Sequence, residues 1–248
     1  MLAILYICHG SRMTKGVDQA KRFVKQCMGQ VNVPIQRICY LELVRPDIQE
    51  GIGSCVRAGA DCIFIQPILL LSAGHAKRDI PRQIAIARRI YPHVHFIYGR
   101  PFGTVDNLVE ILLERLREKS GRLTGEETVL IVGRGSSDPN IPLTFARIRQ
   151  GFTKRGIVDV SVCYMAAARP RIADGLKLVL RRNPARVYIV PCLLFPGILT
   201  KTIKQEIETY NGRAAFVLCR TIGCHPALIR LFRKRIEAAV YDGFPSQY

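Results

Sequence analysis

Residues 4–11 read Ile-Leu-Tyr-Ile-Cys-His-Gly-Ser, and residues 129–136 repeat them as Val-Leu-Ile-Val-Gly-Arg-Gly-Ser. Both are apolar runs that end in a glycine-serine loop, as a buried parallel strand does where it opens into a loop at its carboxyl end. Three more blocks recur in the same order, since Arg45-Pro46, residues 65–70 and Gly103 return as Arg169-Pro170, residues 189–194 and Gly223. The displacement is nearly constant, at about 120 to 125 residues. The sequence therefore predicts an internal duplication.

Strand and helix patterns alternate along both copies. In the first copy they predict strands at Leu2–Cys8, Pro34–Leu41, Cys62–Pro67 and Val94–Tyr98, and helices at Thr14–Met28, Ile48–Ala58, from about Asp79 onward and at Asp106–Glu118. The second copy predicts strands near 128–132, 158–164, 186–191 and 214–219, and helices near 143–151, 171–181, 201–209 and 226–240. Asp79 is expected to cap its helix, and Pro81 suits the first helical turn. We predict an α/β protein with two domains, 1–122 and 123–248, each a four-stranded parallel sheet flanked by helices.

Composition limits the possible partners. The chain has 248 residues, 48% of them hydrophobic, and a formal net charge of +18 that is spread over both copies. Such a surface attracts polyanions, which leaves three interpretations: nucleic acid, a small molecule with many carboxylates, or a basic surface without a specific ligand. No nucleic-acid-binding motif is present, so we expect no nucleic acid partner.

The sequence shows no signal that would target the chain to a compartment other than the cytoplasm. No apolar run approaches the length of a membrane span, and the chain enters a strand from Met1 without a basic leader. The nine cysteines are scattered and form no Cys-x-x-Cys pair, as expected in a reducing compartment. We therefore expect a cytoplasmic protein without a membrane segment.

Two histidines follow apolar strands of the first copy. His9 comes directly after the first predicted strand, and His75 lies in the loop after the third. Loops at the carboxyl edge of an open α/β sheet are where ligands bind, and imidazole is the commonest protein ligand of transition metals. The pattern predicts a divalent-metal site formed by two loops of one domain.

Glu42, at the end of the second predicted strand, is the third candidate, because a carboxylate between Leu41 and Leu43 needs a charged partner or a metal. Two imidazoles and one carboxylate suit Fe(II), Co(II) or Ni(II). The alternatives are structural histidines, a Glu42 paired with Arg45 or Arg12, and a ligand role for Cys8. The second copy favours function, because it has Arg134, Ala166 and Leu199 at the matching positions.

The remaining polar motifs are weaker. His93, His95 and His225 are interpreted as structural or surface residues, since none follows a strand at the loop edge. The run 133–138, Gly-Arg-Gly-Ser-Ser-Asp, lacks the third glycine of a dinucleotide loop, so we expect no nucleotide. Arg134, Ser136 and Ser137 are instead candidates for a nest that binds carboxylates.

Four motifs give the chain a family resemblance: His-Gly-Ser-Arg at 9–12, Leu-Glu-Leu at 41–43, Leu-Leu-Leu-Ser-Ala-Gly-His-Ala-Lys-Arg-Asp-Ile-Pro at 69–81 and Gly-Arg-Gly-Ser-Ser-Asp-Pro at 133–139. Together they resemble the sirohydrochlorin ferrochelatases, class II chelatases related to the cobalt chelatases of cobalamin synthesis. The resemblance implies two Rossmann-like domains of chelatase-like fold, without bound nucleotide. It also implies insertion of Fe2+ into sirohydrochlorin to give sirohaem. His9 and His75 are implied to handle the metal, with Glu42 as their carboxylate partner.

The physical chemistry of such a reaction is consistent with this sequence. Sirohydrochlorin carries many carboxylates, which a basic cleft would hold through charge-assisted hydrogen bonds. Glu42, or a histidine released by the metal, could accept the macrocycle protons as general base. The candidates for substrate contacts are Ser11, Arg12, Arg45, Lys77, Arg134, Ser136 and Ser137.

The remaining expectations concern the cofactor, the metal and the oligomeric state. We expect no tightly bound cofactor, with Fe2+ as the substrate metal, and a monomer or homodimer. The C-terminal residues lack the histidine-rich tail of many cobalt chelatases, which favours iron. Cobalt or nickel insertion is the first alternative, and a metal- or polyanion-binding protein without turnover is the second.

Overall fold

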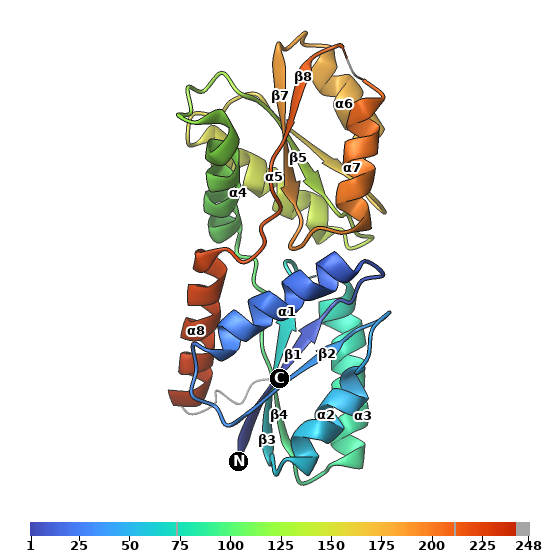
Figure 1. Ribbon diagram of the computed structural model, residues 1–248, viewed down its shortest axis with the longest axis vertical. Coiled ribbons are helices and arrows are strands. Elements are labelled where there is room, and N and C mark those ends of the chain that lie inside the picture. The colour runs from blue at the N-terminus through green and yellow to red at the C-terminus, as the bar shows by residue number, and fades with distance from the viewer. Residues whose placement is uncertain (73, 211, 242–248) are drawn as a thin grey trace. The chain divides into compact units, whose positions relative to one another are not determined.

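The computed structural model describes residues 1–72, 74–210 and 212–241. The chain forms two compact units, each built around one sheet (Figure 1). The first unit contains Met1–Gly103 and the C-terminal segment from Cys224, and the second contains Thr104–Gly223. The predicted α/β class, with four-stranded parallel sheets flanked by helices, is confirmed.

The sheet of the first unit aligns the ends of its central strands. Its strands are β1 (Leu2–Cys8), β2 (Ile35–Tyr40), β3 (Cys62–Ile68) and β4 (His95–Tyr98), in the order β2-β1-β3-β4. All pairs are parallel, and Cys8 pairs with Tyr40 on one side and with Ile68 on the other. Because three strands end at the same level, the loops that follow them begin side by side.

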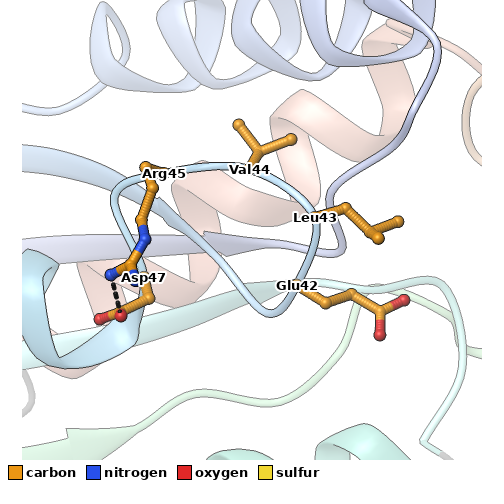
Figure 2. Close-up of a pocket in the computed structure, with 5 residues that line it drawn as sticks. All are labelled: Glu42, Leu43, Val44, Arg45 and Asp47. Atoms are coloured by element: carbon orange, nitrogen blue, oxygen red, sulfur yellow. Dashed lines mark hydrogen bonds and ion pairs between the residues drawn. The ribbon is translucent and has the colours of Figure 1, made fainter.

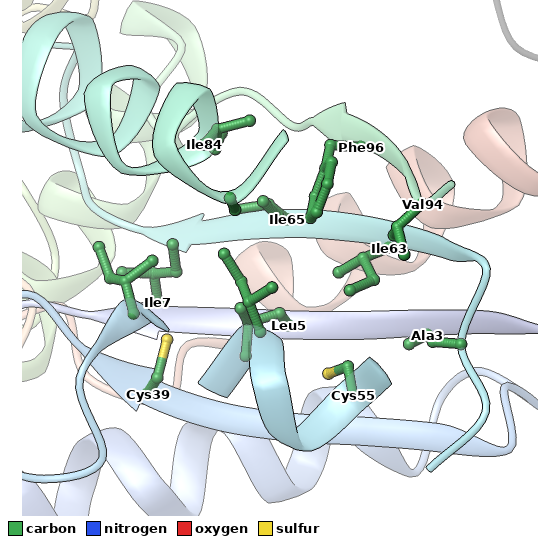
Figure 3. Packing of buried hydrophobic residues seen from close by; sticks show 14 of the residues in the cluster. Ala3, Leu5, Ile7, Cys39, Cys55, Ile63, Ile65, Ile84, Val94 and Phe96 are labelled. Carbon is green, nitrogen blue, oxygen red and sulfur yellow. The ribbon is translucent and has the colours of Figure 1, made fainter. Parts of the chain in front are cut away.

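Helices cover the sheet of the first unit. They include α1 (Thr14–Met28), α2 (Ile48–Arg57) and α3 (Ile80–Ile90), the last preceded by a π-helical turn, η1 (His75–Asp79). A capping box starts α2, because Asp47 accepts a hydrogen bond from the Glu50 amide while the Glu50 side chain accepts one from the Asp47 amide. Side chains of all four strands and of α2 and α3 form the apolar core that Figure 3 shows.

The second unit repeats this arrangement. Its strands are β5 (Thr128–Gly133), β6 (Val160–Tyr164), β7 (Arg186–Cys192) and β8 (Ala215–Leu218), in the order β6-β5-β7-β8. Its helices include α5 (Asn140–Thr153), α6 (Ile172–Leu180) and α7 (Ile198–Glu208). The strand orders of the two sheets are therefore equivalent, as the sequence repeat requires.

The fourth helix of each repeat packs in the other repeat's unit. The helix α4 (Val105–Ser120) contacts α5 and β7, whereas α8 (Pro226–Tyr241) contacts α1. The ring of Phe232 in α8 lies 5.5 Å from the ring of Tyr6 in β1, measured between centroids. The boundary at 122/123 thus describes the repeat in the sequence, whereas the compact units divide the chain after residues 103 and 223.

We call α4 and α8 the exchanged helices, because each packs in the unit of the other repeat. An arginine of each exchanged helix bonds backbone carbonyls of the unit in which the helix packs. Arg235 of α8 donates to the carbonyls of Arg100 and Pro101, at 2.9 and 2.6 Å. In the second unit, Arg115 of α4 donates to the carbonyl of Ile222 at 2.5 Å. Each arginine thus bonds the backbone of the connector that leads into the other exchanged helix.

Two further features concern the cysteines and the helices. All nine cysteines are free thiols. Among the residues that the structure describes, no helix combines the length and the apolar character that crossing a bilayer requires.

Candidate metal and substrate site

The three predicted metal-handling residues lie at one edge of the first sheet. His9 follows β1 directly, Glu42 lies in the loop after β2, and His75 begins the turn η1 after β3. The Nδ1 atom of His9 is 3.5 Å from Oε1 of Glu42. The rings of His9 and His75 meet edge to face, with centroids 4.9 Å apart. The structure therefore brings all three residues together in the first unit.

His75 has a second contact that the sequence interpretation missed. Its Nδ1 lies 2.7 Å from Oδ2 of Asp79, four residues further along the chain. The side chains thus form a row in the order Glu42, His9, His75, Asp79. Both histidine side chains are about one-third exposed, at 29% and 32%, although the Nε2 atom of His9 is itself shielded from solvent.

The expected capping role of Asp79 is wrong. The Asp79 backbone is itself helical, with φ of −73° and ψ of −49°, and its side chain makes no capping hydrogen bond. A cap residue needs an extended backbone to turn its side chain toward the helix amides. Because the π turn continues directly into α3, the Asp79 carboxylate is directed to His75 instead.

The row is not a closed cage. Across residues 1–72, 74–210 and 212–241, no three His, Cys, Asp or Glu side chains are grouped closely enough to hold a metal ion together. His9 contacts both Glu42 and His75, whereas Asp79 contacts His75. The contacts in the row are therefore pairwise, from Glu42 through His9 and His75 to Asp79.

A close backbone approach holds the His9 loop against the Glu42 loop. The Glu42 amide donates to the His9 carbonyl at 3.2 Å, and the Leu41 amide to the Cys8 carbonyl at 2.8 Å. Gly10 has a φ of +92°, and a Cβ at this position would lie 1.9 Å from the Glu42 carbonyl oxygen. Glycine is therefore required at position 10 for His9 and Glu42 to face each other.

The loop after β2 surrounds an open pocket of about 380 Å³, shown in Figure 2. Its lining residues are Glu42, Leu43, Val44, Arg45 and Asp47. Leu43 has a φ of +65°, which is unfavourable for a leucine, and 55% of its surface is exposed. Figure 2 shows Glu42 and Leu43 extending to the same side of the loop, away from the Arg45–Asp47 pair. An apolar side chain therefore lies next to the candidate proton acceptor.

Arg45, a predicted substrate contact, is held by two carboxylates. It forms ion pairs with Asp47 and with Glu50, the latter at 2.7 Å. The Asp47 amide and the Arg45 guanidinium together lower the pKa of Glu50. Arg45 therefore pairs with these two residues rather than with Glu42, whose partner is His9.

The buried thiol of Cys8 does not belong to the row. Burial raises the pKa of Cys8 to about 12, and the residue is only 1% exposed. A cysteine binds a metal as the thiolate. With a pKa this high, Cys8 stays protonated near neutral pH, so it packs as a small apolar residue and does not bind a metal.

The other substrate candidates are distributed over both units. Arg12 and Lys77 are exposed in the first unit, near His9 and His75 in the sequence. The Ser11 hydroxyl accepts a hydrogen bond from the Met13 amide at 3.0 Å, so it also shapes the loop. Three more candidates belong to the loop after β5 in the second unit: Arg134, Ser136 and Ser137.

The loop after β5 has the same backbone as the His9 loop. Gly135 has a φ of +83°, and a Cβ there would lie 1.8 Å from the Ala166 carbonyl oxygen. The Ser136 hydroxyl accepts a hydrogen bond from the Asp138 amide at 3.2 Å, as Ser11 does from Met13. This loop therefore has the shape of the first site without its histidine and glutamate.

The remaining histidines have other surroundings. His225 is 5% exposed, and its Nδ1 accepts a hydrogen bond from the Ala227 amide at the start of α8. His93 and His95 are exposed at the amino end of β4, at the sheet edge opposite the loops of the row. These positions agree with the structural and surface interpretation of all three residues.

Comparison with protein families finds the same duplication. The CbiX family model matches twice, over residues 3–119 and 128–239. A sirohydrochlorin ferrochelatase from Priestia megaterium is 42% identical over 239 residues, which cover 96% of this chain and 90% of the relative. A sirohydrochlorin cobaltochelatase from the same organism is 35% identical and covers 96% of this chain and 79% of its own length.

Solved structures agree with the fold. The structure of SirB from Bacillus subtilis with Fe3+ is 33% identical, with a TM-score of 0.84, and covers 97% of this chain and 96% of its own. A cobalt complex of the sirohydrochlorin chelatase SirB from Bacillus subtilis subspecies spizizenii is 32% identical, with a TM-score of 0.83, and covers 98% of this chain and 96% of its own. The chelatase-like fold predicted from the sequence is confirmed.

Proposed function

This chain belongs to the CbiX family, and from that premise we propose that it inserts Fe2+ into sirohydrochlorin to form sirohaem. The enzyme is accordingly a lyase of the class II chelatase type. Support comes from the relative of highest identity reported above, which is a sirohydrochlorin ferrochelatase. The observation that carries the proposal is the row of Glu42, His9 and His75 at one edge of the first sheet.

The histidines supply the metal handling in this proposal. Neutral imidazoles are good ligands for Fe(II) and Co(II), and two of them leave positions open for water and then for macrocycle nitrogens. His9 and His75 are adjacent and partly exposed, so they can accept the ion without enclosing it. An ion held this loosely can be transferred to a tetrapyrrole, which offers four nitrogens in a plane.

Glu42 is the proposed proton acceptor. Insertion replaces the inner N–H bonds of the macrocycle by bonds to the metal, and the released protons need a base. Glu42 is 47% exposed and lies beside His9, so its carboxylate can take a proton next to the metal and release it to solvent. His9 could accept a proton after it has released the metal.

Exposed cations are the proposed contacts for the substrate carboxylates. Arg12 and Lys77 are exposed close in sequence to the two histidines, and Arg134 is exposed in the second unit. Charge-assisted hydrogen bonds to carboxylates are about twice as strong as neutral ones. The proposed substrate set is completed by Ser11, Ser136, Ser137 and Arg45. The serines would contribute hydroxyls, and Arg45 would have to bind the substrate in addition to its present partners, Asp47 and Glu50.

Several accompanying properties are also proposals. We expect the enzyme to work in the cytoplasm as a monomer or homodimer, with no resident cofactor and no nucleic acid partner. The net charge of +18 is compatible with an anionic substrate. Gel filtration with light scattering, together with metal analysis of the purified protein, tests the oligomeric state and the absence of a cofactor.

The decisive experiment is an anaerobic insertion assay with purified protein. Sirohydrochlorin is mixed separately with Fe2+, Co2+ and Ni2+, and its absorption spectrum is followed in time. Fe2+ is expected to give the fastest enzyme-dependent change. A rate equal to the protein-free reaction for all three ions would exclude a chelatase and favour a metal or polyanion carrier.

Cobalt insertion is the second candidate. It is favoured by the cobaltochelatase relative and by the cobalt complex of a related chelatase. The same ligands bind Fe(II) and Co(II), so the side chains do not separate the two metals. Fast cobalt turnover with negligible iron turnover in the same assay would decide for cobalt.

A further inference from the structure

The contact between Asp79 and His75 has no counterpart in the second repeat. The matching positions are Leu199 and Ile203, in the regular helix α7. Ile203 is fully buried and Leu199 packs against the apolar core of the second unit. The same segment of the fold is therefore stable as an ordinary α-helix with two apolar residues, and packing does not require the polar pair.

The helix geometry of the first repeat differs at this point. Residues His75–Asp79 form a π turn, in which the Ile80 amide donates to the His75 carbonyl five residues earlier. Such turns are rare and frequently occur at functional sites. A further bond fixes the turn, because the Tyr98 hydroxyl donates to the Ala76 carbonyl at 2.8 Å. The backbone below His75 is thus held by β4, and Asp79 is left to act on the ring.

The distance of 2.7 Å between His75 Nδ1 and Asp79 Oδ2 has a chemical consequence. An ionised carboxylate can only accept hydrogen bonds, so the hydrogen has to be on Nδ1. In the neutral imidazole the other nitrogen, Nε2, then carries the free lone pair. Metal-binding histidines in general donate their second N–H to such a partner, which sets both tautomer and ring orientation.

We propose that Asp79 is a positioning residue that holds His75 in the Nδ1–H tautomer, so that Nε2 is the atom offered to the metal substrate. The inference rests on the proposed function, because it gives His75 its metal. It adds a role for Asp79 and specifies Nε2 as the atom of His75 that would bind the metal. Asp79 touches neither the metal nor the tetrapyrrole in this scheme.

The tautomer can be measured without metal and without turnover. Long-range 1H–15N NMR spectra of the metal-free protein distinguish a protonated from an unprotonated ring nitrogen. We expect His75 to show Nδ1–H and an unprotonated Nε2 in the wild-type protein, and a population shifted toward Nε2–H in Asp79→Ala. His75→Ala identifies the resonance. A wild-type His75 with hydrogen on Nε2, or a tautomer unchanged in Asp79→Ala, would overturn the proposal.

Metal binding provides the second readout. Titration with Co2+ should show an affinity about 10- to 100-fold lower in Asp79→Ala, as is typical when such a partner is removed. In the His75→Ala background the same substitution should change the affinity by less than about twofold, because its target is missing. Equal losses in both backgrounds would assign Asp79 a merely structural role and overturn the proposal.

Two controls separate orientation from folding. Asp174→Ala removes an exposed aspartate from the first turn of α6 in the second unit and should leave Co2+ affinity unchanged. If Asp79→Ala fails to fold, Asp79→Glu serves instead, since its carboxylate can still accept from Nδ1 although from a shifted position. It should keep the Nδ1–H tautomer, and loss of that tautomer in a folded Asp79→Glu protein would count against the proposal. The proposed function and this inference can fail separately. If Asp79→Ala changes the tautomer and the Co2+ affinity as expected but the wild-type protein inserts no metal, the proposed function is refuted and this inference stands.

Discussion

The loops after β1 and β5 have the same backbone conformation but carry different side chains. Both contain a glycine with positive φ, at positions 10 and 135, that lies against a carbonyl of the loop after the next strand. That next loop has a non-glycine residue with positive φ in each repeat, Leu43 and Ala167. Each loop ends by pairing with its own strand, since Tyr40 bonds Pro46 and Tyr164 bonds Pro170, both at 2.9 Å.

The side chains on this common backbone differ in kind. The first repeat has His9, Glu42 and His75, whereas the second has Arg134, Ala166 and Leu199. The loop geometry is therefore part of the fold and does not depend on metal chemistry. Because the geometry is shared, the second repeat acts as an internal control for substitutions in the first.

The largest expected effect is on the insertion rate. His9→Ala and His75→Ala should each lower it by about 100-fold or more, since each removes an imidazole proposed to hold the metal and positioned catalytic groups contribute about 10²- to 10⁴-fold. The anaerobic insertion assay measures the rate, and circular dichroism checks the fold. Leu199→Ala, at the position that matches His75, should keep the rate. Unchanged rates in both histidine variants would remove the proposed site.

The exchanged helices predict the next largest effect, on stability. Phe232 of α8 and Leu112 of α4 are both fully buried at corresponding positions of the two repeats. Phe232→Ala should cost about 3–5 kcal/mol and Leu112→Ala about 2–5 kcal/mol of unfolding free energy. Urea denaturation measures both. A cost below about 1 kcal/mol for Phe232→Ala would mean that α8 does not complete the core of the first unit in solution.

The helix exchange also shows where sequence reasoning stops. The strands could be predicted because apolar runs such as Leu2–Cys8 are buried on both faces of a sheet. The helix Thr14–Met28 could be predicted from the spacing of its buried residues. The apolar face of α8 indicates that the helix is packed, but its pattern does not say which sheet it covers. That choice depends on the connector after β8, where no sequence signal distinguishes the two sheets.

The arrangement of the candidate site was predictable to a similar depth. Three polar residues after three aligned strands have to lie at one edge of a parallel sheet, so the meeting of His9, Glu42 and His75 followed from the strand pattern. The role of Asp79 did not, because an aspartate before Ile80 and Pro81 looks the same whether it caps a helix or bonds a histidine. The difference lies in one extra residue within the turn, which the sequence pattern does not reveal.

The two glycines predict a smaller effect that differs between the repeats. Gly10→Ala and Gly135→Ala should each lower stability by at least about 1–2 kcal/mol, because an L-residue is strained at positive φ and the Cβ would meet a carbonyl oxygen. Only Gly10→Ala should also weaken Co2+ binding, since it separates the His9 loop from Glu42. Equal Co2+ affinity in both variants would show that the Gly10 contact does not align the proposed metal-binding residues.

The smallest expected effect has the opposite sign for stability. Leu43→Gly and Ala167→Gly relieve positive φ at matching positions, and each should raise stability by up to about 1 kcal/mol. For a chain of this size that is about 2–4 °C in melting temperature, which scanning calorimetry resolves. Leu43 is 55% exposed, so little buried apolar contact is lost with its side chain.

Enzyme activity should distinguish Leu43→Gly from Ala167→Gly. Leu43 lines the pocket beside Glu42, and its exposed leucine side chain, which the matching Ala167 lacks, is what distinguishes the two positions. A flat macrocycle is a suitable partner for it, so Leu43→Gly should raise the KM for sirohydrochlorin while the melting temperature rises. Ala167→Gly should raise the melting temperature alone. If the KM is unchanged in Leu43→Gly, the Leu43 side chain has no role in substrate binding, and the positive φ of both loops belongs only to the fold that the two repeats share.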